Sequence, residues 1–301
     1  MNRLSIPALL ERLPRGLRRH LAVKLLLSAF RGSHDQWIEF NEHAKAYVDL
    51  RDPDVRNVFL KRCFEADFFT TAFAVLSDGG TFFDSGANFG LCTFGLLPVT
   101  KGDRLACHLF EANHDLIRYL KTSSTLFPTT RIEVIEGCLS DKHGVSHFHI
   151  NTDSPGKSHV AADGASVQRN IVLDDYLDTN RINVVNFLKM DIEGQELTAL
   201  RGLLRALNRG AIEAIYFELR TELLHRYSLV PEDIVQFLNQ GGFRLFYCRE
   251  RDLAGRSTAR VTFSRSGLNR LHLAEIGIVP SDMGTDLLAV HGSLIIERTM
   301  P

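Results

Sequence analysis

The chain has 301 residues, of which 45% are hydrophobic and 24% are charged, and its formal net charge at pH 7 is −1. This composition is typical of a soluble globular protein, and the near-zero charge gives no reason to expect a nucleic-acid partner. The cysteines show no CxxC pair and are Cys63, Cys92, Cys107, Cys138 and Cys248. Their scatter argues against a zinc site or a disulfide framework and is typical of a cytoplasmic protein.

Residues 1–31 are rich in leucine and basic residues, and Lys24 interrupts their apolar run. The run is too short and too charged to span a bilayer, and its order of charges differs from that of a secretory signal. We expect an amphipathic helix that packs on the body of the protein. A helix that contacts a membrane surface or a partner is the alternative.

Residues 60–76 carry apolar side chains at helical spacing. The stripe consists of Leu60, Phe64, Phe68, Ala72 and Leu76. The glycine pair at 79–80 ends this pattern and a strand follows. We therefore predict a helical extension over residues 1–77 and one ligand-binding domain over residues 78–301.

From residue 81 onward, short apolar runs alternate with helical patterns. The runs expected as strands cover residues 81–84, 104–111, 131–137, 184–191 and 211–219, with closing strands at 243–248 and 286–291. A further strand of alternating polarity is expected at 145–150, and a helix with Leu197, Leu200, Leu204 and Leu207 on one face at 193–210. This alternation predicts a doubly wound, mostly parallel α/β sheet, which binds ligands at the carboxyl ends of its strands.

The segment FFDSGANFG (82–90) predicts a tight turn between a buried strand and a helix. Its spacing is D-x-G-x-N-x-G, whereas a dinucleotide-binding turn requires G-x-G-x-x-G. Asn88 stands where a pyrophosphate needs bare backbone, and Asp84 would repel it. The acid suits a cationic ligand such as S-adenosylmethionine (SAM), and the candidate cofactor-binding residues here are Asp84, Ser85, Gly86, Ala87, Asn88 and Gly90.

Glu111 ends the next strand, at about the distance along the chain expected of an acid that binds ribose hydroxyls. Ala112 and Asn113 follow it and complete this part of the candidate cofactor site. The alternative is an exposed charge that caps the following helix. Cys138 and Leu139, after the third strand, are placed by topology to flank an adenine ring.

Several segments resemble the FkbM family of SAM-dependent methyltransferases over roughly residues 60–240. They are FFDSGANFG, LFEAN, IEGCLSDKHG, IVLDDYL and FLKMDIEGQE, and the last carries the distinctive K-x-D-x-E-G-x-E spacing of Lys189, Asp191, Glu193, Gly194 and Glu196. The resemblance implies the Rossmann-like class I methyltransferase fold, with a seven-stranded type of sheet whose last strand is antiparallel. It also implies O-methylation of a sugar, polyketide or other secondary metabolite. Ser85 departs from the valine or isoleucine more common in the family.

The candidate catalytic residues are Asp191, Lys189, Glu193 and Glu218. An alcohol needs help to lose its proton, and Asp191, at the end of the fourth strand, is the best candidate base and also a cofactor contact. Lys189 lies on the same face of the strand, and its expected partner is Asp191, Glu196 or the substrate oxygen. An ion pair between Lys189 and Glu196 that fixes the following helix is the alternative.

Glu193 is expected to cap the helix that follows Asp191, and Glu218 to orient the substrate or SAM. Together with Asp191 they offer oxygen ligands for a divalent cation, but no further acid or asparagine completes a site, so we predict no metal. His147 and His149 are expected to face solvent.

The sequence predicts an acceptor that is a small molecule or glycan with a free hydroxyl, and it does not identify that acceptor or an oligomeric state. Segments near 145–170, with His159, and near 250–283 are expected to cover the substrate. Two alternatives remain: a SAM-fold scaffold without turnover and an NAD-linked oxidoreductase. The acids at each strand end argue against the first, and Asn88 argues against the second.

Overall fold

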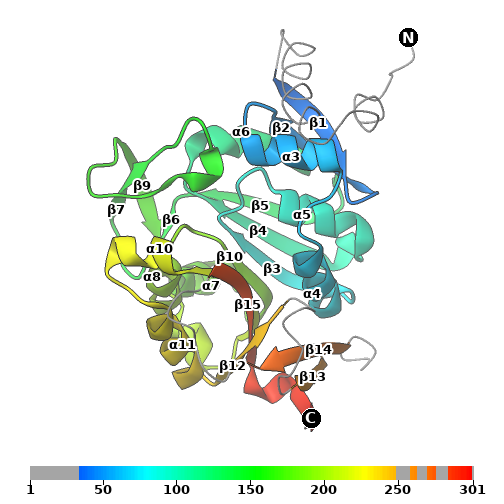
Figure 1. The fold of residues 1–301 in the computed structure, drawn as a ribbon, viewed down its shortest axis with the longest axis vertical. Coiled ribbons are helices and arrows are strands. Elements are labelled where there is room, and N and C mark those ends of the chain that lie inside the picture. Colours follow the sequence, from blue (N-terminus) through cyan, green and yellow to red (C-terminus); the bar gives the residue numbers. More distant parts are fainter. Residues whose placement is uncertain (1–33, 249–257, 263–269, 276–283, 300–301) are drawn as a thin grey trace, which may run out of the picture.

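The computed structural model describes residues 34–248, 258–262, 270–275 and 284–299. Its centre is a sheet that contains the seven strands expected for it, mostly parallel as predicted (Figure 1). Across the sheet these strands are β5 (Arg131–Glu136), β4 (Leu105–Glu111), β3 (Gly80–Ser85), β10 (Val185–Met190), β11 (Ile212–Arg220), β15 (Gly284–His291) and β12 (Phe243–Tyr247).

The first five of these strands pair in parallel, and β15 is antiparallel to both β11 and β12. The predicted doubly wound, seven-stranded class I sheet is therefore confirmed. β10 shows why the sequence forms it: five of its six residues are buried, as expected of a parallel strand covered on both faces.

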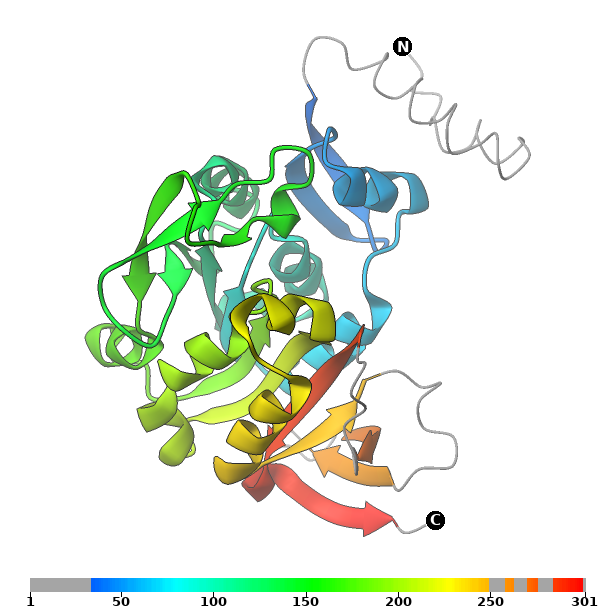
Figure 2. The ribbon, with the colours of Figure 1, turned by 60° about the vertical axis from the view of Figure 1, so that its left-hand side comes forward.

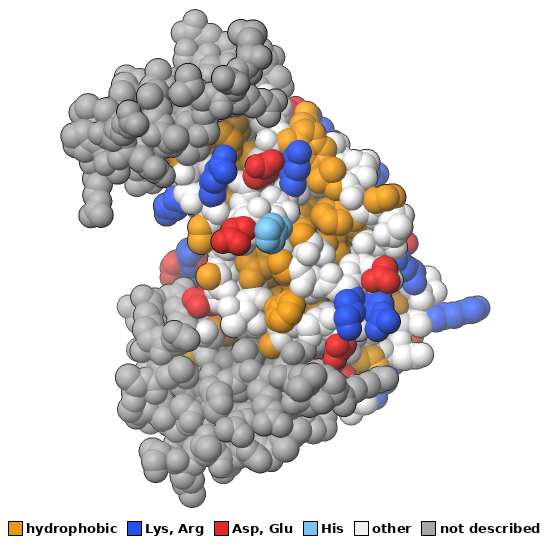
Figure 3. All heavy atoms as spheres, turned by 90° about the vertical axis from the view of Figure 1, so that its right-hand side faces the viewer, with side chains coloured by type: hydrophobic (Ala, Val, Ile, Leu, Met, Phe, Trp, Pro, Cys, Tyr) orange, Lys and Arg blue, Asp and Glu red, His pale blue; other side chains and the backbone are white. Residues whose placement is uncertain are grey.

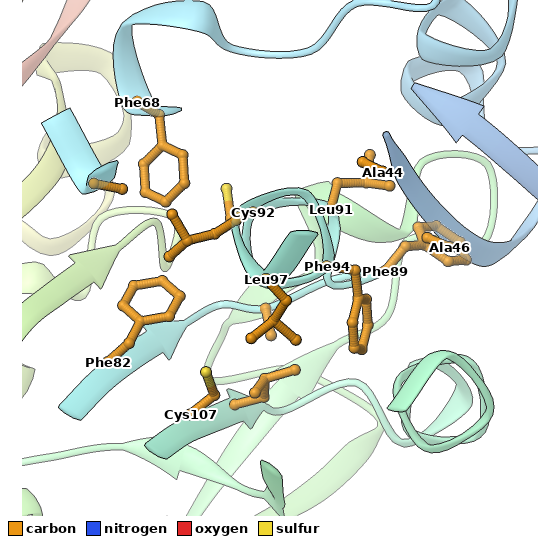
Figure 4. Close-up of a cluster of buried hydrophobic side chains, with 14 of the residues drawn as sticks. Ala44, Ala46, Phe68, Phe82, Phe89, Leu91, Cys92, Phe94, Leu97 and Cys107 are labelled. Carbon is orange, nitrogen blue, oxygen red and sulfur yellow. The ribbon is translucent and has the colours of Figure 1, made fainter. Parts of the chain in front are cut away.

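Helices cover both faces of the sheet (Figure 2). One face packs against α4 (Ala66–Leu76), α5 (Leu91–Leu96) and α6 (His114–Ser124). The other packs against α7 (Leu173–Asn180), α8 (Glu196–Arg201), α9 (Leu204–Asn208) and α11 (Pro231–Gln240), while the short α10 (Thr221–Leu224) follows β11. Figure 4 shows α5 between the sheet, marked by Phe82, and the segment of Ala44 and Ala46. Every residue of α5 is buried, so the helix fixes the turn that precedes it.

The extension before the sheet is not entirely helical, which corrects the sequence prediction. Residues 35–49 form an antiparallel hairpin of β1 (Asp35–Phe40) and β2 (Ala44–Asp49), and α3 (Pro53–Lys61) follows. Apolar residues alternate along both strands and face the core, and Asn41 and Glu42 adopt positive φ in the turn. The helix predicted for residues 1–31 lies outside the described residues.

Two predicted helices are interrupted. The stripe over 60–76 is divided, because α3 ends at Lys61 and α4 begins at Ala66. The residues that cap these two ends, Arg62 and Glu65, both have positive φ. The helix predicted over 193–210 is divided between α8 and α9, which leaves Leu204 46% exposed. The break occurs where Gly202 approaches the Ser140 carbonyl: a Cβ on Gly202 would lie 2.1 Å from that oxygen.

A small second sheet is inserted after β5. Its four strands, in spatial order, are β6 (Cys138–Leu139), β9 (Ser166–Ile171), β7 (Val145–His149) and β8 (His159–Val160). β7 confirms the strand predicted at 145–150 and is antiparallel to both β8 and β9. This inserted sheet lies beside the carboxyl ends of the central strands (Figures 1 and 2).

Three strands extend the central sheet beyond β12, and the sequence reading did not anticipate them. They are β14 (Arg270–Glu275), β13 (Thr258–Thr262) and β16 (Ile295–Thr299), all joined by antiparallel pairing. The rest of the segment 250–283 lies outside the described residues, so its substrate-covering role stays a prediction. Among described helices none is long and apolar enough to cross a membrane. Acidic and basic side chains are intermixed on the face in Figure 3.

Candidate functional site

A cavity lies at the carboxyl ends of β3, β4 and β10. The chain order reverses between β3 and β10, where open α/β sheets bind ligands. The central strands and the turns that follow them contribute Gly86, Asn88, Phe110, Glu111, Ala112, Gly137, Asp191, Ile192, Glu193 and Gln195 to its wall. The inserted sheet and its loop contribute Cys138, Leu139, Phe148, Pro155, Gly156, Ser158 and Val160.

The structure brings seven of the predicted cofactor residues to this cavity. They are Gly86, Asn88, Glu111, Ala112, Cys138, Leu139 and Asp191. Five others do not line it: Asp84, Ser85, Ala87, Gly90 and Asn113. Asp84 and Ser85 are completely buried beneath the turn, and the Asn113 side chain accepts a hydrogen bond from Asp115 N at the start of α6.

The glycine turn is held between β4 and β10. Gly86 and Ala87 both donate backbone hydrogen bonds of 3.0 Å to the Phe110 carbonyl. Gly86 has a φ of +74°, and a Cβ on it would lie 1.9 Å from the Asp191 carbonyl oxygen. Glycine is therefore required here for both its conformation and its lack of a side chain.

Glu111 is buried and faces the cavity, so the alternative of an exposed helix cap is wrong. One carboxylate oxygen accepts a hydrogen bond from Asn88 N at 2.7 Å and the other accepts one from Asn113 N at 2.8 Å. Burial raises the pKa of Glu111, and these backbone donors oppose the rise. A carboxylate offers about four lone-pair sites, so acceptor capacity remains for a ligand.

Lys189 joins the turn to the end of β10. Its Nζ donates to the Gly86 carbonyl at 3.0 Å and lies 3.5 Å from carboxylate oxygens of Asp84 and Asp191. Burial lowers the pKa of Lys189, but the two carboxylates outweigh it and hold the pKa well above its ordinary value. The cation that faces Asp84 is thus Lys189, with Thr93 Oγ1 donating to the other Asp84 oxygen at 2.7 Å.

The proposed ion pair of Lys189 with Glu196 is absent, which corrects that alternative. Glu196 instead accepts hydrogen bonds from Ile192 N at 3.2 Å and Gly194 N at 3.3 Å. It therefore stabilises the turn after Asp191. The prediction that Glu193 caps the following helix is wrong, since α8 begins after Gln195 with no side-chain cap. Register explains the partner of Lys189, since Lys189 pairs with Asp84 across β10 and β3.

Two glutamates with raised pKa values stand beside Asp191. Glu193 lines the cavity 3.6 Å from Arg226, and burial followed by the charge of Asp191 raises its pKa to about 7. Glu218 lies 2.7 Å from Arg220, and the same two causes raise its pKa to about 8. Glu218 does not line the cavity, although it stands next to Asp191 on the neighbouring strand. Within the described residues no three His, Cys, Asp or Glu side chains are arranged to hold a metal ion.

The cavity wall formed by the inserted segment was predicted only as a general cover. A Cβ on Gly156 would lie 2.7 Å from Asn88 Nδ2, and Tyr227 Oη donates to the Val160 carbonyl at 2.8 Å. The alternation in β7 was a usable signal: His147 and His149 are exposed, as predicted, and Phe148 between them is buried. No local signal indicated the 155–160 contacts, because they depend on where the inserted sheet folds back.

Comparison with known proteins is consistent with this architecture. A family model described as the methyltransferase FkbM domain matches residues 84–245, more than half of the chain. The hexuronic acid methyltransferase AglP of Haloferax volcanii is 26% identical over 157 residues, which cover 52% of this chain and 60% of the relative. The match therefore spans less than two thirds of that relative's length.

Two solved structures are similar at low identity. A methyltransferase FkbM from Methylobacillus flagellatus KT has 19% identity and a TM-score of 0.43, with 73% of this chain and 48% of the other covered. A putative caffeoyl-CoA O-methyltransferase from Staphylococcus aureus has 10% identity and a TM-score of 0.40, with 75% and 82% covered.

Proposed function

Because the chain belongs to the FkbM methyltransferase family, we propose that it transfers the methyl group of SAM to a hydroxyl of a sugar or another small hydroxylated acceptor. The observation that carries the proposal is the cavity in which Glu111 and Asp191 face the same space on either side of the glycine turn. The relative that acts on a hexuronic acid supports a sugar hydroxyl. We propose that a hydroxyl of the sugar, and not a carboxylate, receives the methyl group.

The residues of the cavity fit SAM. Glu111 retains lone pairs for ribose hydroxyls, and Cys138 and Leu139 offer an apolar wall for an adenine ring. Asn88 Oδ1 is buried with no hydrogen-bond partner among the described residues, so it is available to a donor on the ligand. SAM supplies an electrophilic methyl group on a sulfonium sulfur, and the chain's own residues bind, orient and handle the proton.

Asp191 is the proposed base. Its carboxylate is 44% exposed at the rim and lies 3.5 Å from the Lys189 ammonium. In the proposed reaction Asp191 takes the proton of the acceptor hydroxyl, while Glu193 and Glu218 orient the acceptor. The segment 145–160, which forms one wall of the cavity, is proposed to exclude water from it.

Calorimetry with S-adenosylhomocysteine and NAD tests the cofactor assignment. We expect the first to bind and the second not to bind. Glu111→Ala should weaken S-adenosylhomocysteine binding by roughly tenfold to a hundredfold, because it removes a buried charged acceptor. Glu136→Ala, an exposed change on the neighbouring strand, is the control and should leave binding unchanged.

A preference for NAD would overturn the proposal. Transfer of labelled methyl groups to a panel of hydroxylated acceptors then separates an enzyme from a scaffold. Cofactor binding with no transfer to any acceptor would favour the scaffold.

A further inference from the structure

A carboxylate from the extension before the sheet lies above the proposed base. Helix α4 is joined to β3 by a short turn at 77–79 and runs back along the sheet, so its first residue faces the carboxyl ends of the strands. Phe68 of α4 packs against Phe187 and Tyr216, with ring centroids 6.0 and 5.3 Å apart. These rings belong to β10 and β11, and Figure 4 shows Phe68 pointing from α4 toward the sheet. Glu65 lies nearly one helical turn before Phe68.

The register places Asp191 and Glu218 under the start of α4. Tyr216 pairs with Lys189 across β11 and β10. Side chains two residues apart point to the same face of a strand, so Glu218 follows Tyr216 on the face that α4 covers, and Asp191 follows Lys189 there. Glu65 does not line the cofactor cavity. Glu218 does not line it either, so the start of α4 lies over a part of the strand ends, beside Asp191, that the cofactor cavity does not include.

Local structure does not explain a glutamate at position 65. The residue precedes α4 with φ 35° and ψ 64°, a left-handed conformation that is unfavourable for residues other than glycine. Its side chain makes no capping hydrogen bond to α4. Strained residues of this kind cluster at functional sites.

The electrostatic surroundings of Glu65 also indicate a functional role. Part of its side chain reaches the surface, yet desolvation by the surrounding protein is the largest cause that raises its pKa to about 7, and the charges of Asp191, Asp286 and Asp84 add to it. Lys189 opposes this rise. A carboxylate kept among other carboxylates at the open side of a site is unfavourable for folding, and such groups are enriched at functional sites.

We infer that Glu65 is an acceptor-binding residue, and that with Asp191 it selects acceptors without a negative charge beside the reacting hydroxyl. The inference rests on the proposed methyltransferase function and narrows its substrate class. Neutral and amino-substituted hydroxylated acceptors are accepted, because the carboxylates accept hydrogen bonds from hydroxyl or ammonium groups. A carboxylated acceptor is repelled.

Three glycosides that differ in one substituent test the inference: methyl glucoside, methyl glucosaminide and methyl glucuronide, which are neutral, cationic and anionic. Labelled methyl transfer from SAM gives kcat/KM for each. We expect the wild-type protein to favour the first two over the glucuronide by on the order of tenfold, the effect of one unit charge across a partly solvated cleft. Glu65→Gln should reduce that preference and leave S-adenosylhomocysteine affinity unchanged. Asp67→Asn, which removes a charge from the same helical turn, should retain the wild-type preference.

Binding of the same three glycosides to the protein with S-adenosylhomocysteine, followed by ligand-detected NMR, gives the ranking without turnover. If binding shows the expected ranking but no glycoside is methylated, the proposed function fails and the inference about Glu65 stands. A wild-type preference for the glucuronide overturns the inference. Equal effects of Glu65→Gln on all three glycosides, or no binding of any of them, overturn it as well.

Discussion

Asp191 combines exposure at the rim with a buried cation behind it. Replacement by Asn keeps size and packing but removes the negative charge that would take the acceptor proton. General-base catalysis contributes about 10²–10⁴-fold, so we expect Asp191→Asn to lower turnover by that order, with a far smaller change in SAM affinity. Turnover is measured with labelled SAM, with added Mg²⁺ and with a chelator, alongside thermal unfolding. Near-normal turnover in a well-folded variant would contradict the assignment of the base.

Asp84 is expected to act on stability, since its carboxylate is fully buried against Lys189. Asp84→Asn leaves a buried ammonium with one counter-charge fewer, and we expect the free energy of unfolding to fall by about 3 kcal/mol. The exposed pair of Asp78 and Lys101 provides the control, because Asp78→Asn should cost less than about 1 kcal/mol. Urea unfolding measures both.

The double variant Asp84→Asn with Lys189→Met removes the orphaned cation and should recover part of the loss. If Asp84→Asn is as stable as the wild-type protein, the ion pair of Asp84 and Lys189 does not stabilise the turn.

The glycine turn is the element that brings β3, β4 and β10 together at the cavity. Gly86→Ala forces a Cβ to within 1.9 Å of the Asp191 carbonyl oxygen, so either the turn or the end of β10 must move. We expect a loss of more than about 2 kcal/mol in stability and a loss of S-adenosylhomocysteine binding.

Gly144→Ala is the matched control for that turn. Gly144 also has a positive φ, +118°, but a Cβ there would meet nothing within 4 Å. It should therefore show only the cost of the backbone conformation, about 1 kcal/mol. Unfolding and calorimetry measure both variants. Equal effects of the two substitutions would mean that the close approach of Gly86 to the end of β10 contributes neither to stability nor to cofactor binding.

Elements with strong periodicity were predictable from the sequence, and elements set by distant contacts were not. The buried run of β10 and its sharp turn into 191–196 follow from local pattern. The hairpin at 35–49 also alternates with period two, but the basic, leucine-rich residues before it favoured the prediction of a helical extension. The division of α8 from α9 depends on Asp174, whose carboxylate accepts hydrogen bonds from Arg205 N and Ala206 N. Because Asp174 lies 31 residues before Arg205, no pattern in the local sequence indicates this contact.

The same distinction applies to the candidate site. Glu111 and Asp191 were predictable because each ends a strand, and parallel strands end at one edge. The partner of Lys189 was not predictable from the sequence. It is decided by the register between β10 and β3, whereas the sequence shows only the spacing within 189–196. Glu65 was missed for a similar reason, since its place above Asp191 depends on how α4 packs on the sheet.

At the scale of the whole molecule, several glutamates have pKa values raised far above 4.5. Burial is the largest cause for each, and the pKa is raised to about 7 for Glu193 and Glu196 and to about 8 for Glu218. A carboxyl with a raised pKa in the folded state keeps its proton after the unfolded chain has lost it. The unfolded state then binds fewer protons, so stability falls as pH rises.

Glu196 offers the clearest test of this pH dependence, because it is 2% exposed and braces the turn after Asp191. Its contribution is fully present below pH 4.5 and is lost as pH rises toward 7, a difference of roughly 3 kcal/mol for a pKa near 7. We expect urea unfolding to show falling stability from pH 5 to pH 8.5. Glu196→Gln keeps an oxygen for the backbone donors but cannot ionise, so its stability should fall less over the same range. Glu136→Gln, an exposed change, should follow the wild-type curve. Parallel curves for Glu196→Gln and the wild-type protein would show that Glu196 is ionised in the folded state at neutral pH, and that the turn holds a carboxylate.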